Sequence, residues 1–119
     1  MNHKETMDRY KLLFVCSRNK WRSPTAEMLV RRHPRFEARS AGTAASARTR
    51  VNAGHLDWAD CVVCMEVAHA KHLRDRFRAG LKGKRLEVLG IEDVYLAMDP
   101  ELIEEIRDGL FRIFPEYEF

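Results

Sequence analysis

Three side chains that could do chemistry together stand within one short stretch of this sequence, namely Cys16, Arg22 and Ser23. A cysteine thiolate is a strong nucleophile that can take a phosphoryl group covalently. An arginine can hold two phosphate oxygens with its planar guanidinium group, which a lysine does less well. A serine hydroxyl can donate a hydrogen bond to the thiolate and can also cap a helix. These residue types at this spacing predict a site that binds a phosphate dianion and attacks its phosphorus.

The residues around this stretch predict a strand, a loop and a helix. Leu12–Val15 form an apolar run that is typical of a buried parallel strand, and Pro24 stands where the first turn of a helix is expected. The N–H groups of such a loop lack intrahelical acceptors, so they can converge on an anion, and their field favours a thiolate. The residues that we expect to contact the phosphate group are Ser17, Arg18, Asn19, Lys20, Trp21 and Ser23.

Each of these features has a plainer interpretation when it is taken alone. A cysteine at the end of a strand is usually a small buried hydrophobe, and Ser23-Pro24 is an ordinary helix start. The strand, the Cys-x5-Arg-Ser-Pro spacing and the helix together favour the phosphate site.

Composition narrows the class of protein. A chain of 119 residues with 45% hydrophobic and 33% charged residues predicts one globular domain over residues 1–119. The net charge of +3 suits an anionic substrate without requiring nucleic acid. Three cysteines argue against a disulfide scaffold, residues 1–10 are too polar for a signal peptide, and no apolar run could span a membrane. We expect a cytoplasmic monomer with no nucleic-acid or membrane partner.

Apolar runs alternate with helical patterns along the rest of the chain, although residues 44–58 show only a weak helical pattern. This alternation predicts an α/β three-layer sandwich with a four-stranded parallel sheet in the flavodoxin-like order 2-1-3-4. The ligand of such a sheet binds beyond the carboxyl ends of its strands, where the loop after Val15 would lie. Strands are expected at residues 12–15, 36–40, 61–65 and 86–91, and helices at residues 23–32, at residues 67–78 with a stop at Gly80, and after Asp99-Pro100.

The sequence resembles the low-molecular-weight protein tyrosine phosphatases over most of its length. Residues 14–27 are similar to the phosphate loop and first helix of that family, residues 40–43 to its turn after strand two, residues 59–65 to its third strand, and residues 91–93 to the start of its acid loop. The resemblance implies that Cys16 attacks a phosphomonoester while Arg22 holds its oxygens. It implies that an aspartic acid then protonates the leaving phenol, and that water hydrolyses the phosphocysteine. It also implies that Asn19 braces the loop, and we expect no cofactor and no metal.

The chain departs from the family pattern in three places. Arg18 stands where the family usually has glycine, so it must tolerate the backbone angles of the loop. Trp21 replaces a second loop cysteine that many members carry, and it could line the pocket mouth or pack beneath the loop. Residues 44–58 are shorter than the corresponding connection in the family, so no rim residues are inferred there.

Two aspartates are candidates for the general acid. Asp99-Pro100 matches the family's dipeptide, but Asp at a helix N-cap followed by Pro is fully explained as capping. Asp93 directly follows Ile91-Glu92 in the family's order, although Val94 replaces the proline. We favour Asp93 because an acid must come within hydrogen-bond distance of the leaving oxygen.

Other patterns favour structural roles. Cys61 and Cys64 fall within an expected strand, where residues three apart point to opposite faces, so we expect buried cysteines rather than a redox pair. His69 and His72 lack a second pair of ligands, so we expect a solvated helix face rather than a metal site. The basic residues 71–85 are likewise expected on a solvated face.

Three functions remain open at this point. The first is a phosphatase that hydrolyses phosphotyrosine or other aryl phosphate monoesters, with a phosphorylated protein or small aryl phosphate as its substrate. The second is an arsenate reductase on the same fold, which would need resolving cysteines, and only Cys61 and Cys64 are available. The third is a module that binds phosphate or a phosphoprotein but has lost the acid.

Overall fold

The computed structural model describes residues 9–119, so residues 1–8, on which most of the expectation of no signal peptide rests, lie outside the described part. No helix among the described residues is long and apolar enough to cross a membrane. In chain order the elements are β1 (Tyr10–Cys16), α2 (Arg22–Arg31), β2 (Phe36–Gly42), α3 (Ala53–Trp58), β3 (Cys61–Cys64), α4 (Val67–Arg76), α5 (Arg78–Leu81), β4 (Arg85–Val88) and α6 (Pro100–Ile113).

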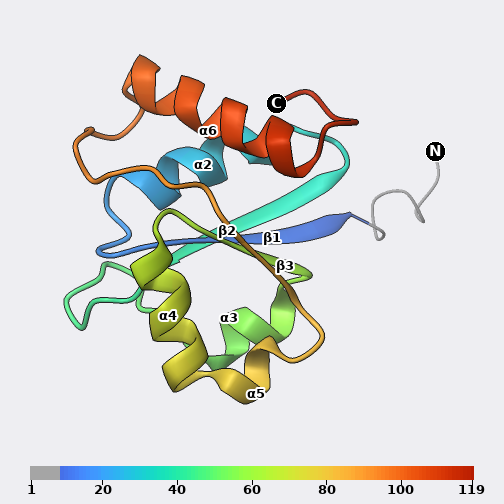
Figure 1. Cartoon of the computed structure of the whole chain (residues 1–119). Helices are drawn as coiled ribbons and strands as arrows, with labels where there is room; N and C mark the ends of the chain where they lie inside the picture. The colour runs from blue at the N-terminus through green and yellow to red at the C-terminus, as the bar shows by residue number, and fades with distance from the viewer. Residues whose placement is uncertain (1–8) are drawn as a thin grey trace.

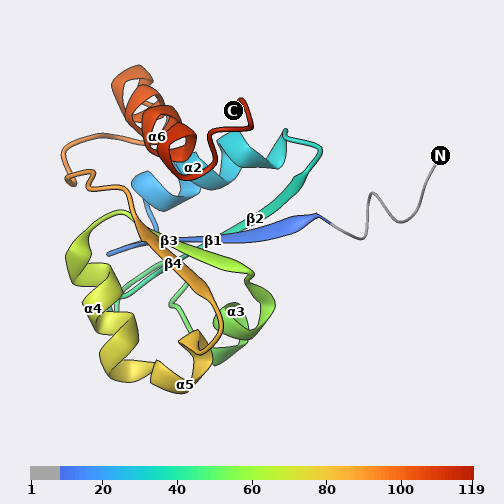
Figure 2. The same ribbon diagram turned by 45° about the vertical axis from the view of Figure 1, so that its right-hand side comes forward.

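The four strands form one parallel sheet in the order β2-β1-β3-β4. Cys16 pairs with Gly42 and Val15 pairs with Cys64, so the carboxyl ends of the three strands lie at one edge of the sheet. Helices α2 and α6 cover one face, and α3, α4 and α5 cover the other (Figure 1 and Figure 2). The predicted α/β three-layer sandwich with strand order 2-1-3-4 is therefore confirmed.

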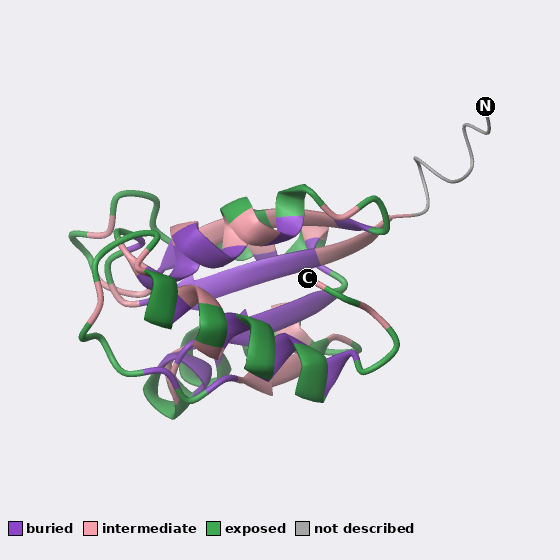
Figure 3. Cartoon of the chain, turned by 90° about the horizontal axis from the view of Figure 1, so that it is seen from above, coloured by how far each residue is buried: buried purple, intermediate pink, exposed green. Residues whose placement is uncertain are grey.

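Strand β1 is the central support of the site and is buried on both of its faces (Figure 3). Leu12 and Phe14 belong to the core beneath α2 and α6, whereas Leu13 and Val15 belong to the core on the opposite face. Full burial of such a side chain contributes about 1.5–3 kcal/mol relative to its exposure. The strand that ends at Cys16 is thus held by packing on both sides.

Helix α6 begins at the cap that the sequence predicts. The Asp99 side chain accepts a hydrogen bond from the Glu101 N–H at 2.8 Å, and Pro100 occupies the first helical position. The apolar face of the helix is buried against the sheet. Gly109 allows close packing there, since a Cβ atom at this residue would lie 2.6 Å from Leu89 Cδ2.

Two expected boundaries are wrong. The helix over residues 67–78 was expected to stop at Gly80, but α4 ends before Phe77, whose φ of −134° and ψ of 37° are not helical. Gly80 instead lies within the short helix α5. The fourth strand ends at Val88 rather than residue 91, although the Ile91 N–H still bonds to the Met65 carbonyl at 2.8 Å. Gly90, with φ of +76°, turns the chain between them, and the Ile91 carbonyl then accepts a hydrogen bond from Arg22 Nη1 at 2.7 Å.

Candidate active site

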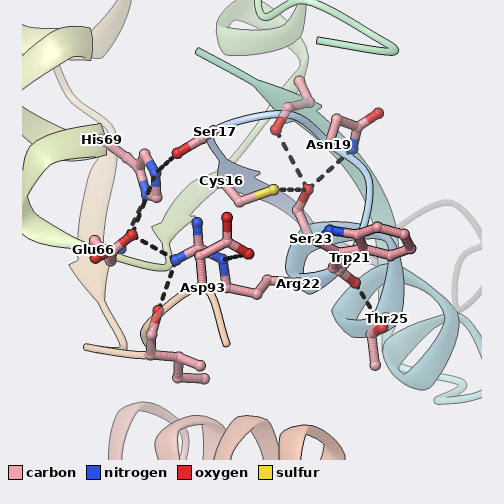
Figure 4. A network of polar contacts seen from close by, with 12 residues as sticks. Cys16, Ser17, Asn19, Trp21, Arg22, Ser23, Thr25, Glu66, His69 and Asp93 are labelled. Atoms are coloured by element: carbon pink, nitrogen blue, oxygen red, sulfur yellow. Dashed lines mark hydrogen bonds and ion pairs between the residues drawn. The ribbon is translucent and has the colours of Figure 1, made fainter. Parts of the chain in front are cut away.

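Cys16 and Arg22 stand at the two ends of a five-residue loop, residues 17–21, with the thiol directed toward Ser23 and the guanidinium toward Glu66 and Asp93 (Figure 4). Cys16 ends β1 and Arg22 begins α2, as the spacing predicts. The Cys16 Sγ atom lies 2.9 Å from Ser23 Oγ, and both residues are buried. Ser23 is therefore placed to hydrogen-bond with the thiol, as expected. The expectation that Ser23 also caps α2 is wrong, because Trp21 occupies the N-cap position and no side chain of the described residues makes a capping hydrogen bond there.

Asn19 braces the loop from within. Its side-chain Nδ2 donates to Ser23 Oγ at 3.0 Å and to Ser40 Oγ at 2.9 Å, and Ser40 in turn donates to Glu27 Oε1 at 2.5 Å. Ser23 Oγ accepts from Asn19, and its own proton can go to the Cys16 sulfur at 2.9 Å or to the Ala41 carbonyl at 3.5 Å, of which the sulfur is the nearer. The loop is thus tied to β2 and α2 by side chains that are mostly buried.

The backbone of the loop presents unused hydrogen-bond donors. Within the described chain, none of the N–H groups of residues 17–21 donates a hydrogen bond. The carbonyls of Ser17 and Arg18 instead accept from the N–H groups of Ala44 and Arg48, at 2.9 and 3.0 Å. A loop with carbonyls bonded to one side and N–H groups left free at a helix N-terminus is suited to an anion.

Backbone strain in the loop falls on Asn19 rather than on Arg18. Asn19 has φ of 56°, in the left-handed region that asparagine tolerates better than most residues. Arg18 has no positive φ, so the arginine that replaces the family's usual glycine adds no strain of this kind. Its side chain is exposed, as is that of Lys20, whose Nζ lies 4.8 Å from the centre of the half-buried Trp21 ring.

Gly42 lets the end of β2 approach the loop closely. A Cβ atom at this residue would lie 2.5 Å from the Ser17 carbonyl oxygen and 2.9 Å from the Asn19 backbone nitrogen. Contacts this short are not tolerated, and backbone atoms cannot move aside without moving the loop. The expected turn at residues 40–43 is wrong, because strand β2 continues to Gly42, and the end of this strand is the support against which the loop rests.

Arg22 is buried, with 1% of its side chain exposed, and residues distant in the sequence hold its guanidinium group. Its Nη1 donates to Glu66 Oε1 at 2.6 Å and to the Ile91 carbonyl at 2.7 Å. Its buried Nε makes no hydrogen bond with the described residues, and it forms a long ion pair with Asp93 Oδ1 at 3.6 Å. A buried donor of this kind is costly unless a ligand satisfies it. The fixed guanidinium therefore keeps a donor for an incoming oxyanion.

His69 belongs to the site, which contradicts the expected solvated position. Its side chain is buried, with 3% exposed, and its Nδ1 accepts from the Glu66 N–H at 3.0 Å. Nε2 therefore carries the proton of the neutral ring and donates to Ser17 Oγ at 2.9 Å. Burial, together with the nearby Arg22 guanidinium, lowers the pKa of His69 to about 4, so the ring is neutral at pH 7. The Ser17 hydroxyl hydrogen is then free for a bound anion.

Sequence reasoning also missed Glu66, although a signal was present. Glu66 follows directly after the third apolar run, so its backbone lies at the carboxyl edge of the sheet beside the loop. It caps α4, and His69 stands three residues later in the first turn of that helix. A search for polar residues at the carboxyl ends of all four expected strands would have found it.

The two candidate acids lie in different surroundings. Asp93 has 43% of its side chain exposed and stands beside Arg22 at the opening of the site (Figure 4). Asp99 is occupied with the cap of α6. Asp93 thus has its carboxylate beside Arg22, whereas the carboxylate of Asp99 is used in the cap of α6.

Several hydrogen bonds anchor the segment that carries Asp93. The Tyr95 hydroxyl bonds to the Glu105 carboxylate of α6, which raises the pKa of Tyr95 to about 12. The Met98 N–H donates to Thr25 Oγ1 of α2 at 2.9 Å. Residues 92–98 are therefore fixed to both helices on this face, although they contain no helix or strand.

The other two cysteines are buried on opposite faces of the sheet. Cys61 lies in the core beneath α2 and α6, and Cys64 lies in the core beneath α4, as the strand periodicity predicts. Burial raises the pKa of each thiol to about 12. Among the described residues, no group of three or more His, Cys, Asp or Glu side chains is placed to hold a metal ion.

Comparisons with known proteins show the fold but not the family. No protein-family model matches the sequence, and no curated protein is significantly similar to it. The YwlE arginine phosphatase from Geobacillus stearothermophilus is 24% identical, with a TM-score of 0.66 over 89% of this chain and 93% of that one. The tyrosine phosphatase Wzb from Escherichia coli K30, solved with phosphate, is 19% identical, with a TM-score of 0.73 over 89% and 96%.

A third solved structure extends this agreement. The low-molecular-weight protein tyrosine phosphatase SP-PTP from Streptococcus pyogenes is 15% identical, with a TM-score of 0.70 over 92% of this chain and 94% of that one. The chain thus has the fold of structures described as tyrosine and arginine phosphatases, over nearly the whole length of each.

Proposed function

We propose that this protein is a cysteine-dependent phosphatase that hydrolyses phosphotyrosine or other aryl phosphate monoesters through a phosphocysteine intermediate. The observation that carries the proposal is a set of donors without hydrogen-bond acceptors among the described residues, namely the buried Nε of Arg22 and the N–H groups of residues 17–21, on the loop that joins Cys16 to Arg22. These donors suit the three non-bridging oxygens of a phosphate monoester. The likeness to folds described as phosphatases supports the same conclusion.

In the proposed first step, the Cys16 thiolate attacks phosphorus while Arg22 and the loop N–H groups hold the oxygens. The S–P bond forms as the bond from phosphorus to the ester oxygen breaks. Asp93, in its acid form, gives its proton to that oxygen, so a neutral phenol leaves. The position of Asp93 beside Arg22, at the open side of the site, supports this role.

In the second step, the Asp93 carboxylate takes a proton from water, whose oxygen attacks the phosphocysteine. The new P–O bond forms as the S–P bond breaks, releasing inorganic phosphate and the Cys16 thiolate. Ser23, at 2.9 Å, stabilises that thiolate by hydrogen bonding. Arg22 and the loop hold the same oxygens throughout, so both steps use one binding geometry.

The charges around the loop favour an aryl ester over a phosphoarginine. Arg18 and Lys20 are both exposed in the loop, and a phosphoarginine substrate would bring a further guanidinium group close to them. The half-buried Trp21 ring offers an apolar surface at the same loop. For these reasons we propose phosphotyrosine, or a small aryl phosphate, as the substrate.

The arsenate reductase alternative is less well supported. Reduction would need a second thiol that can reach Cys16, and both other cysteines are fully buried within β3. Their raised pKa values also leave them protonated and therefore poor nucleophiles. Reaching Cys16 would require the central sheet to open.

Turnover of p-nitrophenyl phosphate tests the proposal, with wild type and Cys16→Ser side by side. We expect turnover by wild type, an initial burst of p-nitrophenol if phosphocysteine accumulates, and no turnover by Cys16→Ser. Phosphoarginine and arsenate with a thioredoxin system are assayed in parallel. Folded wild type that binds vanadate but turns over none of these compounds would contradict the proposal and favour a binding module. Faster turnover of phosphoarginine than of the aryl ester would contradict the substrate class.

A further inference from the structure

One side of the phosphate loop carries arginines that form no ion pair with a carboxylate of the described residues. The segment after β2 folds back on the loop, where the Arg48 N–H bonds to the Arg18 carbonyl at 3.0 Å. This places two exposed arginines on adjoining backbone. Arg50 follows at the bridge to Gly42, and it lies close enough to His72 to help lower the pKa of that ring. We call Arg18, Arg48 and Arg50 the cationic rim.

The two segments that carry the rim contain no acidic residue. Residues 17–24 and 38–56 contain no aspartate or glutamate at all. Within the described chain, the three rim arginines make no ion pair and no side-chain hydrogen bond. Arg85 is paired with Glu87 at 2.7 Å, but exposed Arg74, Arg76 and Arg78 likewise make no ion pair among the described residues, so the position of the rim beside the loop is what sets it apart. The rim therefore keeps its field for a ligand that arrives at the loop.

The other border of the site has the opposite character. Glu92 and Asp93 are exposed there, followed by the exposed apolar side chains of Val94 and Leu96. Figure 4 shows Asp93 beside Arg22, with Asn19 and the turn of the loop on the other side of Cys16. A peptide that crosses the site thus meets positive charge on one side and negative charge on the other. This asymmetry selects for the charge of the residues next to the phosphorylated side chain.

We propose that the cationic rim binds acidic residues that flank the phosphorylated side chain of a protein substrate. The inference rests on the proposed function, because the phosphorylated side chain must first enter the loop. Each exposed ion pair contributes a few-fold in affinity, so two pairs give about a tenfold preference at low salt. Since these charges are exposed, the preference falls as ionic strength rises.

The test uses two phosphotyrosine peptides that differ only in their flanking residues, Asp and Glu in one and Asn and Gln in the other. Values of kcat/KM for both peptides are measured with wild type, Arg48→Glu and Arg50→Glu. The same enzymes are assayed with p-nitrophenyl phosphate, a small substrate that has no flanking residues. Arg78→Glu, on the distant helix α5, makes the same change in net charge and is the matched control. Circular dichroism verifies that each variant is folded.

We expect wild type to prefer the acidic peptide about tenfold, and both rim variants to lose most of that preference. Hydrolysis of p-nitrophenyl phosphate should stay unchanged in them, and Arg78→Glu should behave as wild type. Equal kcat/KM for the two peptides in wild type would overturn the inference, as would an equal loss in Arg78→Glu.

A binding measurement keeps this inference separate from the phosphatase proposal. Fluorescence anisotropy of both labelled peptides with Cys16→Ser reports recognition without turnover. If wild type hydrolyses none of the substrates, the phosphatase proposal fails. Tenfold tighter binding of the acidic peptide would still support the proposal that the cationic rim binds acidic flanking residues. If p-nitrophenyl phosphate is hydrolysed and both peptides bind equally, the rim proposal fails alone. Binding of anionic vesicles or single-stranded RNA by the rim, with no peptide preference, would also overturn it.

Discussion

Asp93 Oδ1 lies 3.6 Å from Arg22 Nε, so a partly exposed carboxyl group stands beside the guanidinium that we propose to hold phosphate. This position gives Asp93 access to the leaving oxygen of a bound ester. We predict that Asp93→Asn lowers kcat for aryl phosphates about 100-fold, because an amide has the same shape but no acidic proton. The loss should grow with the pKa of the leaving phenol, and a series of substituted phenyl phosphates measures this.

Asp99→Ala is the matched control for Asp93→Asn. It removes the side chain that caps α6, so we expect the free energy of unfolding to fall by about 1 kcal/mol. Its kcat should remain close to that of wild type. A 100-fold loss in Asp99→Ala with little effect in Asp93→Asn would reverse the assignment of the acid.

Glu66 holds the buried guanidinium of Arg22, and its removal should cost stability. We predict that Glu66→Ala lowers the free energy of unfolding by about 2 kcal/mol, because a hydrogen bond to a buried charge is lost. Equilibrium unfolding in urea measures the change. Glu92→Ala, at an exposed glutamate of the neighbouring segment, should change stability by less than about 0.5 kcal/mol. Similar losses in the two variants would contradict the role of Glu66.

The parts of the site that the sequence predicts are those set by local pattern. Continuous apolar runs mark strands that are buried on both faces, and their alternation with helices determines the parallel sheet. The spacing from Cys16 to Arg22 spans one strand-to-helix loop, so both ends of that loop were predictable. Asn19 followed from the resemblance, and its bonds to Ser23 and Ser40 agree with the bracing role that the resemblance implies.

The parts of the site that the sequence does not predict depend on contacts between residues that are distant in the chain. His69 reaches Ser17 across 52 residues, and Glu66 reaches Arg22 across 44. Helical periodicity counts apolar side chains, so a buried histidine on a polar-looking helix is assigned to solvent. The expectation that Ser23 caps α2 was wrong for a related reason. The Ser23 hydroxyl hydrogen-bonds with Cys16 and Asn19, and these contacts depend on tertiary packing that no local sequence pattern reveals.

The buried neutral ring of His69 should make stability depend on pH. Its pKa falls from 6.5 in an unfolded chain to about 4 in the fold, so the unfolded state binds more protons between these values. This contribution to stability is complete above pH 6.5 and is lost as the pH falls toward 4. We predict an acid-dependent loss of about 3 kcal/mol from this residue, which urea unfolding at several pH values measures.

His69→Gln isolates this contribution. Glutamine does not titrate, so the slope of stability against pH between 4 and 6.5 should be much smaller in the variant. The variant also loses the hydrogen bond between His69 Nε2 and Ser17 Oγ, so we expect weaker phosphate binding at pH 7. An unchanged slope would show that groups other than His69 cause the acid sensitivity.

Gly42 should be needed for both stability and phosphate binding, because β2 and the loop meet there without room for a side chain. A Cβ atom would press on the Ser17 carbonyl and the Asn19 nitrogen, which belong to the loop itself. We predict that Gly42→Ala lowers stability by about 1–3 kcal/mol. Because the displaced loop should bind phosphate poorly, added phosphate should raise its melting temperature less than that of wild type. Gly80→Ala, where a Cβ atom meets only the Leu56 side chain at 3.3 Å, should keep the full phosphate shift. Equal phosphate shifts in the two variants would contradict the role of Gly42 as a support of the loop.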